Sequence, residues 1–213
     1  MNLVFPRLYA IIDPTLLTIS ELELAEALAG SGVELIQYRS KTATSRQFFE
    51  VSRKLSSFLR PRGVRFVVND RADIALLADA GGVHVGQDDL SVEDARTIVG
   101  PGRWVGFSTH SLEQVAAADA TSADYIAFGP IFPTATKKNP DPVVGTGLLR
   151  KARQLTRKPL VAIGGITVER AAEVYRAGAD SLAVIRDLIS VPNPAVRARE
   201  YLDVAASLAT REA

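Results

Sequence analysis

The chain has 213 residues, of which 47% are hydrophobic and 23% are charged, the balance of a globular protein with a substantial core. Its net charge of +1 gives no reason to expect nucleic acid or a membrane surface as a partner. The absence of cysteine excludes disulfides, thiolate metal sites and cysteine nucleophiles, and two histidines are too few for a histidine-rich zinc site.

The N-terminal segment lacks the charged start and apolar stretch of a signal peptide, and the chain contains no run of about 18 apolar residues. We therefore expect a cytoplasmic protein with small-molecule partners, and no nucleic acid or membrane partner. Assembly into a homo-oligomer is left open by the sequence.

Short β-type runs alternate with longer helical patterns along the chain. Eight such parallel strands can close into a (β/α)8 TIM barrel, an α/β fold, and we expect one domain over residues 1–213. An open doubly wound sheet is the alternative, because the pattern alone does not show closure. The predicted strands are Leu8–Asp13, Glu34–Arg39, Arg65–Asp70, Gly82–Gly86, Trp104–Thr109, Tyr125–Pro130, Pro159–Gly165 and Ser181–Ile185.

Four of the helical patterns have recognisable N-terminal caps. Ser20, Ser91, Ser111 and Thr167 each precede a segment with an acidic residue in its first turn, where a carboxylate favours the positive end of the helix dipole. The last pattern, at about 194–209, is expected to form a closing C-terminal helix.

Charged side chains follow the second, third and fourth predicted strands. Arg39 and Lys41 lie two residues apart, so on an extended chain they face the same side and can bind one phosphate group. Taken alone, a solvated strand end explains them better. Asp70 and Asp89 come to neighbouring strand ends, where two carboxylates and ligand oxygens suit Mg²⁺. A helix cap and a turn explain these acids equally well.

A serine and a histidine, Ser108 and His110, end the fifth predicted strand. The pair invites comparison with hydrolases, but the nucleophile-elbow pattern Gly-x-Ser-x-Gly does not occur around Ser108. We expect Ser108 to contact a ligand and His110 to be structural. His84 lies within a strand and is expected to be a buried histidine with satisfied hydrogen bonds.

The segment after the sixth strand carries the hydroxyls of Thr134 and Thr136 and the charge of Lys137. Its length of about 16 residues favours a functional loop over a solvated basic loop. Gly165 and Arg186 follow the seventh and eighth strands, where barrels commonly bind phosphate at backbone N–H groups.

Read together, these motifs resemble the thiamine phosphate synthase family, also called thiamine-phosphate pyrophosphorylase. They occur in the family's order from Leu8 to about Ile189. The matching motifs are Gln37-Tyr38-Arg39-x-Lys41, Asn69-Asp70, His84-Val85-Gly86-Gln87-x-Asp89, Gly106-x-Ser108-x-His110, Gly129-Pro130-Ile131-Phe132-x-Thr134-x-Thr136-Lys137 and Ile163-Gly164-Gly165-Ile166.

The resemblance implies a transferase of thiamine biosynthesis that joins a pyrimidine methyl diphosphate to a thiazole phosphate and releases pyrophosphate, with Mg²⁺ on Asp70 and Asp89. The implied pyrimidine diphosphate site comprises Gln37, Arg39, Lys41, Asn69, Ser108 and Lys137, of which Arg39, Lys41 and Lys137 stabilise the leaving group. The implied thiazole phosphate site comprises Thr134, Thr136, Gly165, Ile185 and Arg186, and we include the neighbouring Tyr38, Ser40 and Ala135 in the substrate site.

Two residues depart from the family pattern. Ser40 stands where the family usually has Glu, and Arg186 stands where it usually has Ser.

Two other functions remain open at this point. One is a thiazole tautomerase of the same fold, with His110 as its base, and the other is a non-catalytic barrel that binds a phosphate ligand.

Overall fold

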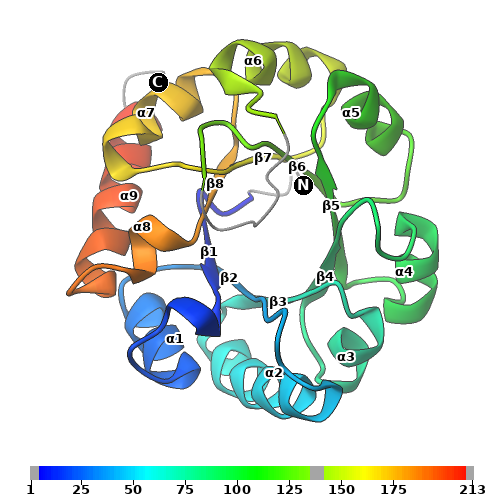
Figure 1. Cartoon of the computed structure of the whole chain (residues 1–213), viewed down its shortest axis with the longest axis vertical. Helices are drawn as coiled ribbons and strands as arrows, with labels where there is room; N and C mark the ends of the chain where they lie inside the picture. Colours follow the sequence, from blue (N-terminus) through cyan, green and yellow to red (C-terminus); the bar gives the residue numbers. More distant parts are fainter. Residues whose placement is uncertain (1–4, 135–141, 210–213) are drawn as a thin grey trace.

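The computed structural model describes residues 5–134 and 142–209. Figure 1 looks along the barrel, with the strands forming an inner ring and the helices an outer one. All neighbouring strands are parallel, and β1 pairs with β8, so the predicted barrel is confirmed and the open sheet is wrong. The strands are β1 Leu8–Ile12, β2 Leu35–Tyr38, β3 Arg65–Asn69, β4 Gly82–Val85, β5 Trp104–Thr109, β6 Tyr125–Phe128, β7 Leu160–Ile163 and β8 Ser181–Val184.

The helices that follow the strands cover the outside of the barrel (Figure 1). The helix expected at about 194–209 is observed as α9, which packs against α1 and α7. No helix within the described ranges is long and apolar enough to cross a membrane. The helices are α1 Glu21–Gly30, α2 Ser45–Leu59, α3 Ala72–Leu77, α4 Val92–Val99, α5 Leu112–Asp119, α6 Gly145–Leu155, α7 Val168–Arg176, α8 Arg186–Ile189 and α9 Pro194–Ala209, with short 3₁₀ turns at Pro14–Leu16 and Arg60–Arg62.

Three of the four predicted helix caps are confirmed. The Ser20 hydroxyl accepts a hydrogen bond from the Glu23 N–H, and the Glu23 carboxylate binds back to the Ser20 N–H. Ser91 and Ser111 cap α4 and α5 in the same way through their hydroxyls. Thr167 occupies the cap position of α7, but its side chain accepts no capping hydrogen bond.

Side chains alternate between the two faces of each strand, and this alternation separates two hydrophobic cores. On β1, Leu8, Ala10 and Ile12 pack outward against the helices, whereas Tyr9 and Ile11 point into the barrel. The outward-facing residues form the larger core between strands and helices. The inward-facing residues therefore decide what fills the barrel and what remains open.

Aromatic rings fill the amino-terminal half of the barrel. Phe5 stacks on Trp104 with ring centroids 5.0 Å apart, and Tyr125 packs against Phe5, Trp104 and Tyr9. Gly106 provides the space for this packing, because a Cβ atom there would lie 2.0 Å from the Tyr125 ring. These rings fill the floor of the barrel, and the cavity lies on their other side, toward the carboxyl ends of the strands.

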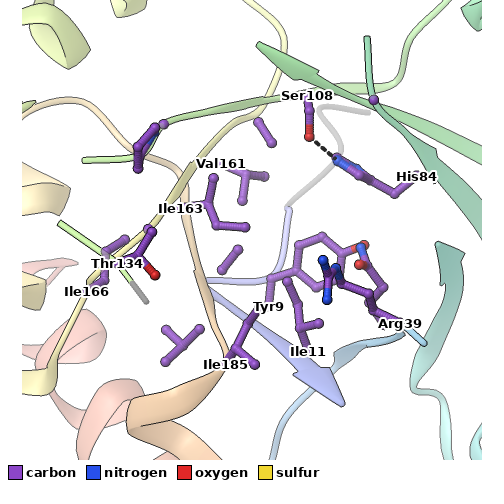
Figure 2. A pocket seen from close by; sticks show the side chains of 18 of the residues that line it. Tyr9, Ile11, Arg39, His84, Ser108, Thr134, Val161, Ile163, Ile166 and Ile185 are labelled. Carbon is purple, nitrogen blue, oxygen red and sulfur yellow. Dashed lines mark hydrogen bonds between the residues drawn. The ribbon is translucent and has the colours of Figure 1, made fainter. Parts of the chain in front are cut away.

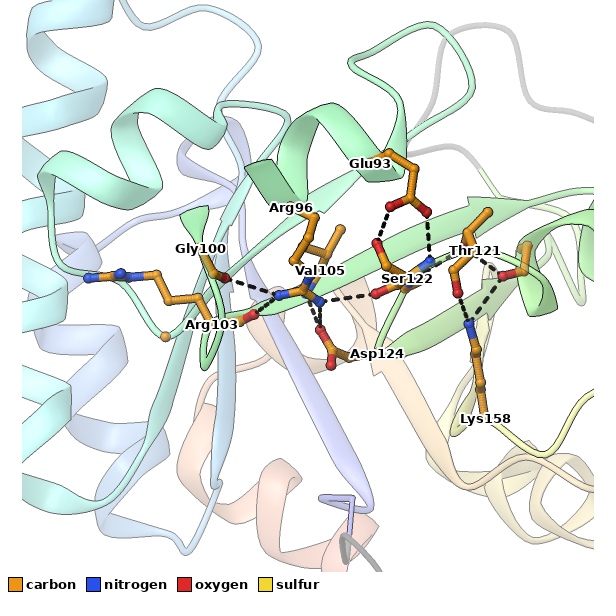
Figure 3. A network of polar contacts seen from close by, with 12 residues as sticks. Glu93, Arg96, Gly100, Arg103, Val105, Thr121, Ser122, Asp124 and Lys158 are labelled. Atoms are coloured by element: carbon orange, nitrogen blue, oxygen red, sulfur yellow. Dashed lines mark hydrogen bonds and ion pairs between the residues drawn. The ribbon is translucent and has the colours of Figure 1, made fainter. Parts of the chain in front are cut away.

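A polar network ties together the amino-terminal ends of β5 and β6 (Figure 3). The Arg96 guanidinium on α4 donates to the carbonyl oxygens of Arg103 and Ser122 and to the Asp124 carboxylate. The same carboxylate accepts the Val105 N–H at 2.7 Å. One side chain thus connects a helix to two strands at the end of the barrel remote from the opening.

We expect Arg96→Met to lower the free energy of unfolding by about 2 kcal/mol, because it leaves partly buried oxygens without their charged donor. Urea unfolding measures the change. Arg62→Met is the control, since the Arg62 guanidinium is exposed and bonds the Phe58 carbonyl within the same turn region. Its expected cost is about 0.5 kcal/mol or less. Equal costs for the two variants would contradict the structural role of Arg96.

Candidate active site

A cavity of about 780 Å³ opens at the carboxyl ends of the strands, within the size range of small-molecule sites. Figure 2 shows its wall, with Arg39 and Tyr9 on one side, Thr134 and Ile166 on the other, and Ile185 between them. Most of the side chains that the sequence singles out meet here. The predicted site residues that line the cavity are Gln37, Arg39, Lys41, Asn69, Asp70, Asp89, Ser108, Thr134, Gly165, Ile185 and Arg186.

Two predicted substrate residues do not line the cavity. Tyr38 points outward from β2 and stacks on Phe48, with ring centroids 5.0 Å apart. Strand alternation turns the Tyr38 side chain away from the barrel interior, which its neighbours Gln37 and Arg39 face, and a substrate role for Tyr38 stays a prediction. The Ser40 hydroxyl accepts the Ala43 N–H at 3.2 Å, which shapes the turn after β2.

Three further predicted residues, Ala135, Thr136 and Lys137, lie outside the described residues. Their roles in binding thiazole phosphate and the leaving diphosphate stay predictions.

Both predicted cations after β2 are paired with carboxylates. The Arg39 guanidinium donates to Asp13 at 2.6 Å, and Asp13 is only 3% exposed. The Lys41 ammonium lies 2.5 Å from Asp70 Oδ2. Arg39 is thereby held in one orientation by a buried partner. Lys41, through its ion pair with Asp70, lies next to the acidic residues of the site.

The acidic side of the site consists of Asp70 and Asp89. Asp70 follows β3 with a backbone φ of 63°, a conformation that Asp tolerates better than most residues, and its N–H donates to the His84 carbonyl at 2.8 Å. Asp89 Oδ2 accepts the Gly86 N–H at 2.8 Å. Partial burial, followed by repulsion from the Asp70 carboxylate, raises the pKa of Asp89.

Two neighbouring carboxylates suit a hard cation that is completed by other oxygens, provided that the Lys41 ammonium gives up Asp70 Oδ2. No group of three or more His, Cys, Asp or Glu side chains fit for a metal occurs within residues 5–134 and 142–209. A cation on Asp70 and Asp89 would therefore take its remaining oxygens from water and a phosphorylated ligand. The donor set is chemically compatible with Mg²⁺ under that condition.

The buried His84 links the aromatic residues inside the barrel to the cavity through hydrogen bonds. His84 Nε2 lies 2.8 Å from Ser108 Oγ, as the dashed line in Figure 2 marks, and His84 Nδ1 lies 3.0 Å from the Tyr125 hydroxyl. Burial lowers the pKa of His84 to about 4, so the ring is a neutral imidazole near neutral pH. His84 is thus the buried, hydrogen-bonded histidine that the sequence predicts.

His110 connects β5 to the segment after β6. Its Nδ1 lies 2.7 Å from the Gly129 carbonyl, which can only accept, so this nitrogen carries the proton. Its own N–H donates to Gln114 at 2.6 Å. These contacts tie His110 to the backbone, but its side chain also lines the cavity, so the structural role expected for it stays a prediction.

The opposite side of the cavity is built from glycine backbone and arginines. Gly164 and Gly165 follow β7 with φ angles of 100° and 62°, and Gly164 O accepts the Phe132 N–H at 3.0 Å. Arg186, at the start of α8, lines the cavity beside Gly165. Exposed backbone and a guanidinium make this side suitable for a phosphate group.

Several cavity residues escape sequence reasoning. Arg170 lines the cavity from the first turn of α7, with its guanidinium 4.5 Å from the Phe132 ring centroid. Gln87 belongs to a matching motif without an assigned role, and its side chain donates to the Ser108 carbonyl at 2.5 Å. Asp13, the buried partner of Arg39, follows β1 as a charged residue and so carries a sequence signal, whereas Tyr9 and Arg170 stand in apolar and helical patterns that carry none.

Comparisons with known proteins agree with this geometry. Residues 8–188 match the family model described as thiamine monophosphate synthase. A thiamine-phosphate synthase of Koribacter versatilis is 50% identical over 210 residues, which cover 95% of this chain and 97% of that protein. A thiamine-phosphate synthase of Chloroflexus aurantiacus is 42% identical, covering 91% of this chain and 90% of the relative.

Solved structures give the same result. The thiamine phosphate pyrophosphorylase of Pyrococcus furiosus superposes with a TM-score of 0.86 at 33% identity, covering 95% of this chain and 96% of that one. Because the family model spans most of the chain and close relatives align along nearly their whole length, the chain belongs to the thiamine monophosphate synthase family.

Proposed function

We propose that this enzyme joins a 4-amino-2-methyl-5-pyrimidinylmethyl diphosphate to a thiazole phosphate, forming thiamine phosphate and pyrophosphate. One observation supports this most directly. The cavity has two different sides for phosphorylated groups, an acid–cation side at β2 to β4 and a glycine–arginine side at β7 and β8. In a closed ring of eight strands, β3 lies opposite β7, so two phosphorylated ligands can bind facing one another.

The acid–cation side is assigned to the pyrimidine diphosphate. Arg39, fixed by buried Asp13, and Lys41, beside Asp70, carry charge toward the diphosphate oxygens. Gln37 and Asn69 are buried on the adjoining wall, where their amides can bond the aminopyrimidine. Lys137, outside the described residues, is assigned to the same leaving group.

The reaction breaks the bond between the pyrimidine methylene carbon and the diphosphate oxygen, and the electron pair leaves with the diphosphate. The electron-rich aminopyrimidine spreads the positive charge left on carbon. The thiazole nitrogen then forms the new C–N bond with its own lone pair. No protein nucleophile is needed, so the chain's contribution is positioning and electrostatic stabilisation of the leaving group.

Asp70 and Asp89 are the residues proposed to hold Mg²⁺, which when bound supplies positive charge to the diphosphate oxygens. The Asp89–Gly86 hydrogen bond orients one of these carboxylates before any ligand arrives. On the other side, Gly165, Thr134 and Arg186 are proposed to hold the thiazole phosphate, together with the backbone at Ile185 and with Thr136 and Ala135. Apolar side chains between the two sides, Ile163 and Val161 among them, limit water at the reacting carbon (Figure 2).

Incubation of the purified protein with both phosphorylated halves and Mg²⁺ tests the proposal. We expect thiamine phosphate and pyrophosphate in equal amounts, measured by fluorescence after oxidation and by a pyrophosphate-coupled assay. Binding of both ligands without either product would indicate a non-catalytic barrel. Conversion of a thiazole carboxylate phosphate alone, without pyrophosphate release, would indicate the tautomerase and overturn the proposal.

A further inference from the structure

A chain of hydrogen bonds crosses the inside of the barrel and ends at Ser108 in the cavity wall. Gln37 Nε2 donates to the Tyr9 hydroxyl at 2.7 Å, and the Tyr9 and Tyr125 hydroxyl oxygens lie 2.9 Å apart. Tyr125 then contacts His84 Nδ1 at 3.0 Å, and His84 Nε2 contacts Ser108 at 2.8 Å. The side chains come from β2, β1, β6, β4 and β5, so this series of hydrogen bonds spans most of the barrel's width.

The interior members of this hydrogen-bond chain expose little surface, although Tyr9, Gln37 and His84 line the cavity. Tyr125 is fully buried, Tyr9 is 1% exposed, Gln37 is 2% exposed and His84 is 7% exposed. With so little exposed surface, each polar atom is paired within the protein, and these contacts set the direction of each bond. The aromatic packing of Tyr125 against Phe5 and Trp104 fixes the middle of the chain in place.

The first donor determines the direction of all the others. The Tyr9 oxygen accepts from the Gln37 amide, so the single Tyr9 proton is directed to Tyr125. The Tyr125 proton is then directed to His84 Nδ1, which must be the unprotonated nitrogen. A neutral imidazole with a bare Nδ1 carries its proton on Nε2.

The protonation of His84 Nε2 determines which way the hydrogen bond to Ser108 runs. His84 Nε2–H donates to the Ser108 oxygen, so the serine's own proton is not used by His84 and can be donated into the cavity. With the opposite direction, Ser108 would donate to His84 and present only lone pairs to a ligand. A diphosphate oxygen or an unprotonated ring nitrogen is an acceptor, and it would be repelled by those lone pairs.

We propose that Tyr9, Tyr125 and His84 are positioning residues that hold the Ser108 hydroxyl as a hydrogen-bond donor toward an acceptor atom of the pyrimidine diphosphate. The proposal rests on the proposed function for the identity of the ligand. The donor-to-acceptor direction along the series of hydrogen bonds rests on the hydrogen-bond geometry alone. These residues touch no reacting atom by this argument, and they act only through Ser108.

The tautomer of His84 in the ligand-free protein is the first test. Long-range ¹H–¹⁵N NMR at mildly alkaline pH reports which ring nitrogen carries the proton, and the chain has only two histidines. We expect the Nε2–H form for His84. His110 is an internal reference for the opposite Nδ1–H form, because its Nδ1 faces the Gly129 carbonyl. An Nδ1–H tautomer at His84 would overturn the proposal.

A double-mutant cycle is the second test. Tyr125→Phe keeps the ring but removes the donor to His84, and we expect KM for the pyrimidine diphosphate to rise about tenfold, the size of one lost bond to a charged group. KM for the thiazole phosphate should not change. In a Ser108→Ala background the same substitution should have no further effect on catalysis, since its action passes through Ser108. Independent effects of the two substitutions would overturn the proposal.

Tyr175→Phe is the matched control for losing a buried tyrosine hydroxyl. Its hydroxyl donates to the Arg7 carbonyl at 2.7 Å, outside the cavity, so both KM values should stay unchanged. Tyr9→Phe repeats the cycle at the next link if Tyr125→Phe does not fold. Failure of the wild-type protein to form thiamine phosphate would refute the proposed function, whereas the His84 tautomer would still decide the direction of the chain.

Discussion

Asp89→Asn is expected to lower kcat at least about 100-fold while leaving the fold intact, because it removes charge from the site where the diphosphate leaves. The amide oxygen of Asn can still accept the Gly86 N–H that Asp89 accepts at 2.8 Å. The turn after β4 therefore keeps its hydrogen bond, and the variant isolates the carboxylate charge. Pyrophosphate release measured over a range of Mg²⁺ concentrations, together with thermal unfolding, separates the two effects.

Asp88→Asn is the matched control for this experiment. Asp88 also lines the cavity and is exposed, but it belongs to neither the carboxylate pair nor the Gly86 turn bond. We expect its kcat to change by less than about threefold, as for a screened surface charge. If Asp89→Asn kept full Mg²⁺-dependent activity, or if the two variants behaved alike, the assignment of Asp89 as a metal ligand would be wrong.

Gly164→Ala is expected to destabilise the protein by about 3 kcal/mol or more, from a clash together with an unfavourable φ. A Cβ atom at this position would lie 2.6 Å from the Pro130 Cα, and backbone cannot move aside as a flexible side chain does. The φ of 100° adds a second penalty. Urea unfolding measures the loss, and KM for the thiazole phosphate should rise because the Phe132 N–H bond to Gly164 holds this side of the cavity.

Gly63→Ala separates the two penalties. Gly63 has a φ of 73°, but nothing lies within 4 Å of a Cβ atom placed there. Its expected cost is about 1 kcal/mol, from the backbone conformation alone. A Gly164→Ala variant no less stable than Gly63→Ala would show that the segment from Gly129 to Pro133 relaxes away from β7.

The sequence predicts the strands well because each is an apolar run bounded by glycine or polar residues. Most predicted strands extend one or two residues too far, as at Pro159–Gly165 against the observed Leu160–Ile163, since the chain leaves the extended conformation at Gly164 and Gly165, whose φ angles are 100° and 62°. Closure of the barrel depends on the pairing of β1 with β8, which are about 170 residues apart. No local pattern carries that information.

In the site, too, residues with a local sequence signal were predicted, whereas contacts between residues far apart in the sequence were not. Arg39, Lys41, Asp70 and Asp89 were predictable because charged side chains directly after buried strands are unusual. The outward direction of the Tyr38 side chain follows from strand alternation, because its neighbours Gln37 and Arg39 line the cavity. The hydrogen bond from Tyr9 to Tyr125 joins residues 116 positions apart, and both had the appearance of ordinary core aromatics.

The cavity's described lining is electrically balanced. Within residues 5–134 and 142–209, Arg39, Lys41, Arg170 and Arg186 face four aspartates, Asp70, Asp88, Asp89 and Asp187. With the protein's net charge of +1, such a lining creates no strong attractive potential beyond the cavity mouth. Anionic substrates should therefore arrive by unassisted diffusion, with association rates that change little with ionic strength. Discrimination would then occur after entry, through exchange of the Asp70 carboxylate for phosphate oxygens at Lys41, while Arg39 keeps its ion pair with the buried Asp13.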